Sequence, residues 1–295
     1  MPRDAVCYQS IALTTKSKKN VNNQTKMAKT NFQELLEAGA HFGHMKRKWN
    51  PAMAPYIFSE RNGIHIIDLH KTVAKIDEAA AALKQIAKSG RTILFVATKK
   101  QAKQVVADKA TEANMPYITE RWAGGMLTNF TTIRKAVKKM DSIDAMKENG
   151  TTKTLSKREQ LQIERQRAKL EKNLGSIRTM GRIPAALFVV DVLKEHIAVE
   201  EAIRLGIPVF GIVDTNSNPN NIDFVIPSND DSTKAIELIL GEMVDAINEG
   251  VQERKIEKAD EPKEGEQAPE VKERRTRAKK TRAPKAEAAE KPAEA

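Results

Sequence analysis

Three aspartates fall near the ends of short apolar runs, where a parallel sheet would expose them at one edge: Asp68, Asp191 and Asp214. Ligands of open α/β sheets bind at that edge, and paired carboxylates there could hold Mg²⁺. Aspartates in this position more often cap the following helix or accept hydrogen bonds from loop amides. We favour the capping role. A phosphate-ligand or metal-dependent α/β enzyme that uses these aspartates is the alternative.

His41 and His44 are spaced so that one helical face could present both to a zinc ion. Gly39 and Gly43 argue against a continuous helix, and the sequence offers no third or fourth ligand nearby, so packed or hydrogen-bonded histidines are expected. Cys7 is the only cysteine. Disulfides within the chain and zinc sites with several thiolates are therefore excluded.

The familiar motifs of α/β enzymes are absent from the sequence. It contains no GxGxxG dinucleotide loop and no GxxxxGK[ST] phosphate loop, and no GxSxG nucleophile elbow. We therefore predict no catalytic residue, no protein metal site, no cofactor and no small-molecule substrate. Magnesium held through RNA or through a strand-end aspartate is the one exception considered.

Basic residues exceed acidic ones by 50 to 39, which gives a net charge of +11 and favours a polyanionic partner. Both tryptophans lie in basic, loop-like segments, in which Arg and Lys can contact phosphates while Asn and Thr bond sugar or phosphate oxygens. Such contacts suit folded RNA, whereas an aromatic content of 4% disfavours a base-stacking platform. The candidate RNA-binding residues of these segments are Lys46, Arg47, Lys48, Trp49, Asn50, Arg121, Trp122, Gly124, Gly125, Thr128 and Asn129.

Alternating strands and helices must position these segments. Apolar runs predict strands, and apolar residues at helical spacing predict the helices between them. Strand–helix alternation gives a parallel sheet with helices on both faces, so we predict a doubly wound α/β fold. The expected strands are 64–69, 92–97, 116–119, 185–191, 208–214 and 224–226, and the expected helices are 72–87, 99–113, 196–205 and 232–248.

Residues 131–174 predict a different element, an antiparallel helical hairpin inserted into the α/β domain. Two apolar stripes flank the turn signal Asn149-Gly150, and Ser156 with Glu159 predicts a capping box, as does Asn31 with Glu34 before the first helix. The hairpin carries twelve basic and six acidic residues. This excess adds four cations to the candidate RNA-binding set, namely Arg134, Lys135, Lys138 and Lys139.

The chain is expected to have four parts. These are a disordered basic extension over 1–30, an α/β domain over 31–127 and 178–250, the hairpin over 128–177, and a disordered charged tail over 251–295. No stretch approaches the roughly 18 apolar residues of a membrane span, and residues 1–26 lack the apolar core of a secretory signal. We therefore expect no membrane partner, and the single cysteine fits a reducing compartment such as the cytoplasm.

Four motifs, in order, resemble the bacterial small-subunit ribosomal protein S-two family. They are FQELLEAGAHFGH, RWAGGMLTNF, PAALFVVD with the later Glu201 and GIP, and VDTNSNPNNIDFVIPSNDD. The runs KRKWNPAMAPYIF and ERNGIHIIDLHKT are especially similar to members from the Bacteroidetes. The resemblance implies a flavodoxin-like domain with a coiled-coil protrusion. It also implies a non-enzymatic protein that binds 16S rRNA near the head–body junction, contacts neighbouring ribosomal proteins and helps to seat the S-one protein.

Overall fold

The computed structural model describes residues 31–260. The expected extension over 1–30 and the part of the expected tail beyond 260 lie outside the described residues. Within the described range, no helix is both long enough and apolar enough to cross a bilayer.

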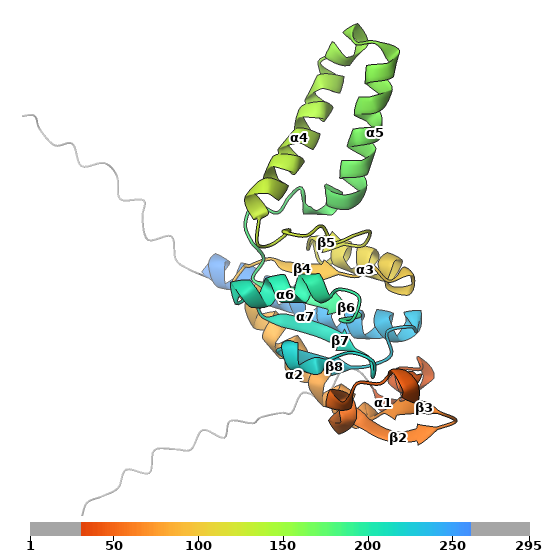
Figure 1. Cartoon of the computed structure of the whole chain (residues 1–295). Helices are drawn as coiled ribbons and strands as arrows, with labels where there is room; N and C mark the ends of the chain where they lie inside the picture. The colour runs from red at the N-terminus through yellow and green to blue at the C-terminus, as the bar shows by residue number, and fades with distance from the viewer. Residues whose placement is uncertain (1–30, 261–295) are drawn as a thin grey trace, which may run out of the picture.

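A five-stranded parallel sheet forms the centre of the molecule (Figure 1). The strands are β4 (Ile93–Val96), β5 (Tyr117–Ile118), β6 (Ala186–Val190), β7 (Val209–Val213) and β8 (Phe224–Pro227), in the spatial order β5-β4-β6-β7-β8. Every residue of β4, β6 and β7 is buried, as expected for parallel strands covered on both faces.

Helices cover both faces of this sheet, which confirms the doubly wound α/β prediction. Helices α2 (Leu69–Lys88), α3 (Lys100–Glu112) and α7 (Thr233–Asp260) supply one apolar layer against Phe95, Phe188 and Phe210. Helix α6 (His196–Leu205) and the segment around Trp122 contribute to the second layer. The short helix α1 (Phe32–Glu37) buries Leu35 in the first layer.

A second, antiparallel sheet was not predicted. It has the order β1-β3-β2, formed by β1 (Phe42–Met45), β2 (Ile57–Arg61) and β3 (Ile64–Ile67). The expected strand 64–69 therefore belongs to this small sheet, and part of the basic segment expected to be a loop is strand β1. Alternating burial along β3 marks a sheet with one covered face. Short strands with Gly, His and charged residues carry little apolar signal, which explains the error.

Two predicted helix starts also need correction. Asn31 precedes α1 but makes no side-chain cap, so the expected capping box with Glu34 is absent. Helix α2 begins at Leu69 rather than at Thr72, because the Asp68 carboxylate accepts the His70 N–H at 3.1 Å. The Thr72 hydroxyl instead donates to the Pro227 carbonyl at 2.6 Å, which links α2 to the end of β8.

Helices α4 (Phe130–Glu148) and α5 (Lys157–Leu174) run side by side away from the β5 end of the sheet (Figure 1). The predicted capping box of α5 is confirmed, since the Ser156 hydroxyl accepts from the Glu159 N–H and the Glu159 carboxylate accepts from the Ser156 N–H. Arg167, which interrupts the apolar stripe of α5, pairs with Asp144 on α4. An ion pair thus replaces an apolar contact between the two helices.

Helix α7 extends to Asp260, so the expected start of the tail at 251 is wrong by ten residues. The added turns run beside α2, where the Lys84 ammonium lies 2.6 Å from Glu253 and the Lys88 ammonium lies 2.5 Å from Glu257. Gly250 permits this approach, because a Cβ there would lie 2.4 Å from the Lys84 carbonyl oxygen. Composition alone could not reveal these contacts with a distant helix.

Candidate functional site

The first basic segment follows strand β1 as a 3-10 turn, Lys46–Lys48, with all three cations exposed. Lys46 forms an ion pair 2.8 Å from Glu60 on β2, and among residues 31–260 neither Arg47 nor Lys48 has one. Trp49 is half-buried against His65, with ring centroids 5.1 Å apart. The Asn50 side chain accepts from the Ala52 N–H at 2.9 Å, so it caps the next turn. The cations face solvent, while Trp49 and Asn50 hold the segment in place.

The second segment, residues 121–129, wraps around one carboxylate. Glu201 on α6 accepts the Trp122 indole N–H at 3.1 Å and the Gly125 N–H at 2.7 Å through Oε1. Its Oε2 accepts the Leu127 N–H at 3.0 Å and, from Thr128, both the backbone N–H and the hydroxyl at 3.1 Å. Sequence reasoning did not identify Glu201 as the residue that organises this segment.

Hydrogen bonding governs the charge of Glu201. Burial is the largest single influence and raises the pKa of this carboxyl. The hydrogen bonds that Thr128, Trp122, Gly125 and Leu127 donate together outweigh burial and hold the pKa of Glu201 below its usual range. The carboxylate is therefore ionised at neutral pH and fixes the loop.

The other candidates of the second segment differ in exposure. Arg121, Gly124 and Asn129 are exposed, and a Cβ at Gly124 would meet no neighbouring atom. Gly125 has a positive φ of 84°, and a Cβ there would also lie 3.2 Å from the Cβ of Asn129, so both the backbone conformation and the space favour glycine. The Asn129 side chain accepts the Thr132 hydroxyl at 2.8 Å at the start of α4. Of this segment, Arg121 is the cation that faces solvent.

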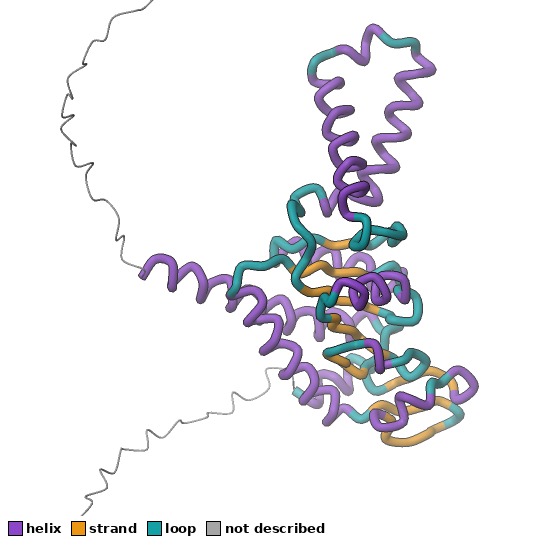
Figure 2. Tube along the Cα trace, turned by 60° about the vertical axis from the view of Figure 1, so that its left-hand side comes forward, coloured by secondary structure: helices purple, strands orange, loops and turns teal. Residues whose placement is uncertain are grey.

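The hairpin cations lie on the first turns of α4. Lys135, Lys138 and Lys139 are exposed, whereas Arg134 is half-buried and donates to the Met180 carbonyl at 3.0 Å. Figures 1 and 2 place this helix pair at one end of the molecule and the β1-β3-β2 sheet at the other. The structure thus brings the hairpin cations near residues 121–129 but keeps them apart from Lys46–Lys48.

A third group of polar residues gathers at the carboxyl edge of the parallel sheet. Asp191 follows β6, Asp214 follows β7, and Asp230 lies beyond β8. The Lys99 ammonium, just beyond β4, lies 2.7 Å from Asp230. His44 of β1 reaches the same edge, with its Nδ1 2.9 Å from Asp214.

Neighbouring residues complete this edge. Asp231 lies 2.6 Å from the Lys99 ammonium and 3.7 Å from His44 Nε2. The structure therefore gives His44 the carboxylate neighbours that the sequence did not reveal. The consecutive pair Asp230-Asp231, three residues beyond the end of β8, was the signal that could have indicated two of them. Asp68, the third strand-end candidate, caps α2 instead.

Burial shapes the charges of this edge. It raises the pKa of Asp230 to about 7, and the nearby Asp214 charge adds to the rise. Burial also opposes ionisation of Asp214, but the hydrogen bond and charge of His44 outweigh it, so the pKa of Asp214 lies below its usual range. The hydrogen bond to Asp214 raises the pKa of His44. The edge is a charged network that links both sheets.

Comparison with known proteins assigns the chain to a family. The model of the family described as ribosomal protein S2 matches residues 35–250. The chain is 72% identical over 243 residues to a small ribosomal subunit protein uS2 of Phocaeicola vulgatus, an alignment that covers 82% of this chain and 87% of the relative. It is 73% identical over 234 residues to the uS2 protein of Parabacteroides distasonis, covering 79% and 84%.

A third relative gives the same picture. The uS2 protein of Porphyromonas gingivalis is 72% identical over 232 residues, which cover 79% of this chain and 83% of the relative. The family match includes the parallel sheet, the segment around Glu201, the hairpin helices and the carboxyl edge. The resemblance read from the four sequence motifs is confirmed, and the chain belongs to the ribosomal protein S2 family.

Proposed function

We propose that the protein is a structural, non-enzymatic component of the small ribosomal subunit and that it binds the RNA of that subunit. The observation that carries this proposal is the family match over residues 35–250 together with relatives named small ribosomal subunit protein uS2. Its place of action is the ribosome in the cytoplasm. As the resemblance implies, it lies near the head–body junction, contacts neighbouring ribosomal proteins and helps to seat the S-one protein.

Two exposed cationic surfaces supply the RNA contacts in this proposal. The turn surface consists of Lys46, Arg47 and Lys48, and the hairpin surface consists of Lys135, Lys138 and Lys139. Arg121, in the segment that precedes α4, is a further exposed cation. Exposed ammonium and guanidinium groups can neutralise phosphates without cost to the core. The surfaces lie at opposite ends of the molecule (Figure 1), so one protein can contact two separated stretches of backbone.

The candidates whose side chains make contacts within the protein act through the fold rather than by direct contact with RNA. Trp122 and Thr128 donate to Glu201, and the side-chain oxygen of Asn50 caps a turn. Their loss would displace the adjacent cations. We therefore assign RNA contact to the cations and positioning to Trp49, Asn50, Trp122 and Thr128.

The test replaces Lys46, Arg47 and Lys48 together with Gln. Because these side chains are exposed, the melting temperature should change little. RNA affinity should fall, and the slope of log affinity against log salt should shrink by about 2 to 3 if each cation contacts one phosphate. A control that changes Lys75, Lys234 and Lys255 to Gln, on α2 and α7, removes the same charge elsewhere.

The outcomes distinguish RNA contact at each cationic surface from the structural role in the small subunit. An unchanged salt slope in the turn variant, or the same slope change in the control, contradicts RNA contact at the turn. Changing Lys135, Lys138 and Lys139 to Gln tests the hairpin surface in the same way. Failure of the unaltered protein to co-sediment with small subunits would overturn the structural role itself.

A further inference from the structure

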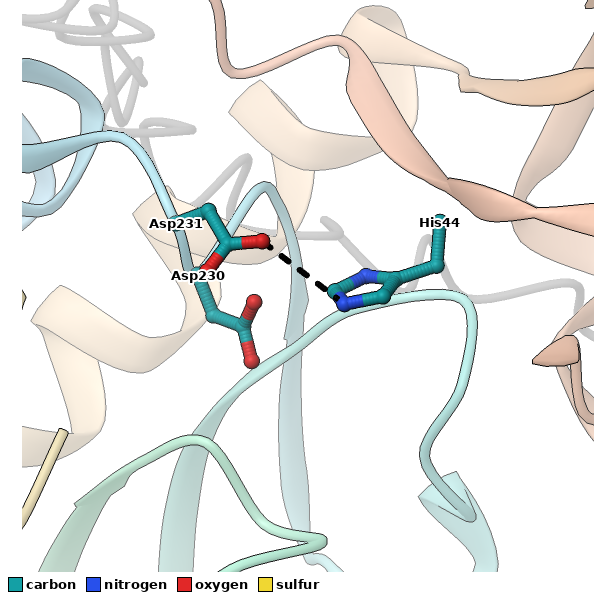
Figure 3. A group of neighbouring side chains, drawn as sticks. All are labelled: His44, Asp230 and Asp231. Carbon is teal, nitrogen blue, oxygen red and sulfur yellow. Dashed lines mark ion pairs between the residues drawn. The ribbon is translucent and has the colours of Figure 1, made fainter.

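Three potential metal ligands meet where the two sheets join. His44 of β1 and the consecutive pair Asp230 and Asp231 each offer one ligand atom, and these atoms all lie within 4.8 Å of one another. Figure 3 shows the imidazole of His44 facing both carboxylates, with the Asp231 oxygen 3.7 Å from Nε2.

One oxygen of the cluster has no partner. Asp230 is 0% exposed, its Oδ1 lies 2.7 Å from the Lys99 ammonium, and its Oδ2 accepts no hydrogen bond. Buried polar atoms without a partner are costly and uncommon. The free oxygen belongs to a carboxylate that lies beside Asp231 and faces the His44 ring (Figure 3). A bound cation would supply the missing partner.

A second carboxylate orients the histidine for coordination. Asp214 is 1% exposed in its side chain and lies 2.9 Å from His44 Nδ1. When Nδ1 carries the proton and donates it to Asp214, the neutral ring presents the lone pair of Nε2 to the opposite side. Metal-binding histidines are usually held in this way by a carboxylate on the other ring nitrogen.

The charge of the edge also favours a cation. Three aspartates, Asp191, Asp230 and Asp231, lie within 4.0 Å of one ammonium group, that of Lys99. A fourth, Asp214, pairs with His44 instead. Lys99 contacts Oδ1 of both Asp230 and Asp231. The second oxygen of Asp231 lies 3.7 Å from His44 Nε2, and the second oxygen of Asp230 has no hydrogen-bond partner. Because Lys99 contacts only one oxygen of each carboxylate, the other oxygen of each is available to a metal ion.

We propose that His44, Asp230 and Asp231 bind one Zn²⁺ ion, with Asp214 as the residue that orients the His44 ring. A nitrogen ligand with two carboxylates suits Zn²⁺, whereas Mg²⁺ prefers an all-oxygen octahedral shell. Water completes the tetrahedral shell. The ion links strand β1 to the loop after β8, so its role is to fasten the antiparallel sheet to the parallel one.

The test uses the full chain with Cys7 changed to Ser, which removes the single thiol as a competing ligand. After chelator treatment and dialysis, zinc binding is measured by competition with a chromophoric chelator, and the melting temperature is recorded with and without ZnCl₂. One zinc ion per chain and a higher melting temperature are expected, since a ligand that binds only the folded state stabilises it.

Variants locate the site. Asp231 is 52% exposed in its side chain, so Asp231→Asn should preserve the fold while lowering zinc affinity at least tenfold. His44→Gln should do the same. The controls are Asp108→Asn on α3 and His196→Gln on α6, both exposed residues outside the cluster. They should bind zinc like the unaltered protein.

Three results would overturn the proposal. Zinc binding that survives both Asp231→Asn and His44→Gln would place the ion elsewhere. Equal loss in the Asp108 or His196 control would show scattered surface binding. Equal stabilisation by MgCl₂ at the same concentration, sensitive to Asp231→Asn but not to His44→Gln, would contradict the nitrogen ligand.

Discussion

Glu201 offers the sharpest test of the fold, because a single carboxylate holds the loop of residues 121–129. Glu201→Gln keeps the shape of the side chain but replaces one oxygen with an NH₂ group. If the NH₂ takes the Oε1 position, it faces two donors, from Trp122 and Gly125. If it takes the Oε2 position, it faces three donors, from Leu127 and Thr128. At least two hydrogen bonds to a charged acceptor are lost either way.

The expected loss follows from this count. A hydrogen bond to a charged group contributes about 1.5–3 kcal/mol, and relaxation of the loop recovers part of that. We expect Glu201→Gln to lower the free energy of unfolding by about 3 kcal/mol. For a domain of this size the melting temperature should fall by roughly 6–12 °C. Urea unfolding followed by circular dichroism measures the first quantity and a thermal scan the second.

At low pH the difference in free energy of unfolding between the unaltered protein and Glu201→Gln should disappear. The pKa of Glu201 is lowered in the folded protein, so its stabilisation is fully present above the ordinary value of 4.5 and is lost as the pH falls through the folded value. Protonated Glu201 then resembles Gln. The unfolding free energies of the unaltered protein and Glu201→Gln should therefore converge as the pH falls below 4.5 and through the lowered pKa of folded Glu201.

The control is Glu200→Gln, an exposed residue beside Glu201 on the same helix. It should change the free energy of unfolding by less than about 0.5 kcal/mol. Equal effects of the two substitutions would refute the argument, since the donors around residue 201 would then contribute nothing. A gap between the unaltered protein and Glu201→Gln that persists unchanged at pH 3 would refute the role of its charge.

Three further substitutions test particular contacts. Gly250→Ala should lower the free energy of unfolding by about 2 kcal/mol or more, because its Cβ would lie 2.4 Å from the Lys84 carbonyl oxygen; urea unfolding measures this, and no loss would contradict the close approach of α2 and α7. In Gly206→Ala the new Cβ would meet no neighbouring atom, so the free energy of unfolding should fall by only about 1 kcal/mol, because of the positive φ of 65°. Gly241→Ala is the control, since Gly241 also has free space but no positive φ. Ser156→Ala should speed amide hydrogen exchange in the first turns of α5 by roughly fivefold, equivalent to about 1 kcal/mol, and unchanged exchange would show that the capping box does not hold that turn.

Local sequence patterns determined the elements whose signal is local. The buried strands β4, β6 and β7 read as unbroken apolar runs, and α6 was predicted with the bounds that the structure has, because Gly206 ends it in a left-handed conformation. The capping box at Ser156 was likewise readable, since its two partners are three residues apart. Family membership followed from short motifs in a fixed order.

Tertiary structure decided what depends on residues far apart in the chain. Glu201 lies 73 to 79 positions from the groups it accepts, and the Thr72 hydroxyl lies 155 positions from the Pro227 carbonyl. His44 finds Asp214, Asp230 and Asp231 only after β1 packs against the carboxyl edge of the parallel sheet. No periodic pattern along the chain predicts such contacts between distant residues. The sequence alone determined which residue types are present. Hydrogen bonds and metal coordination act only over a few ångströms, so these residues can interact only after the tertiary fold has brought them together.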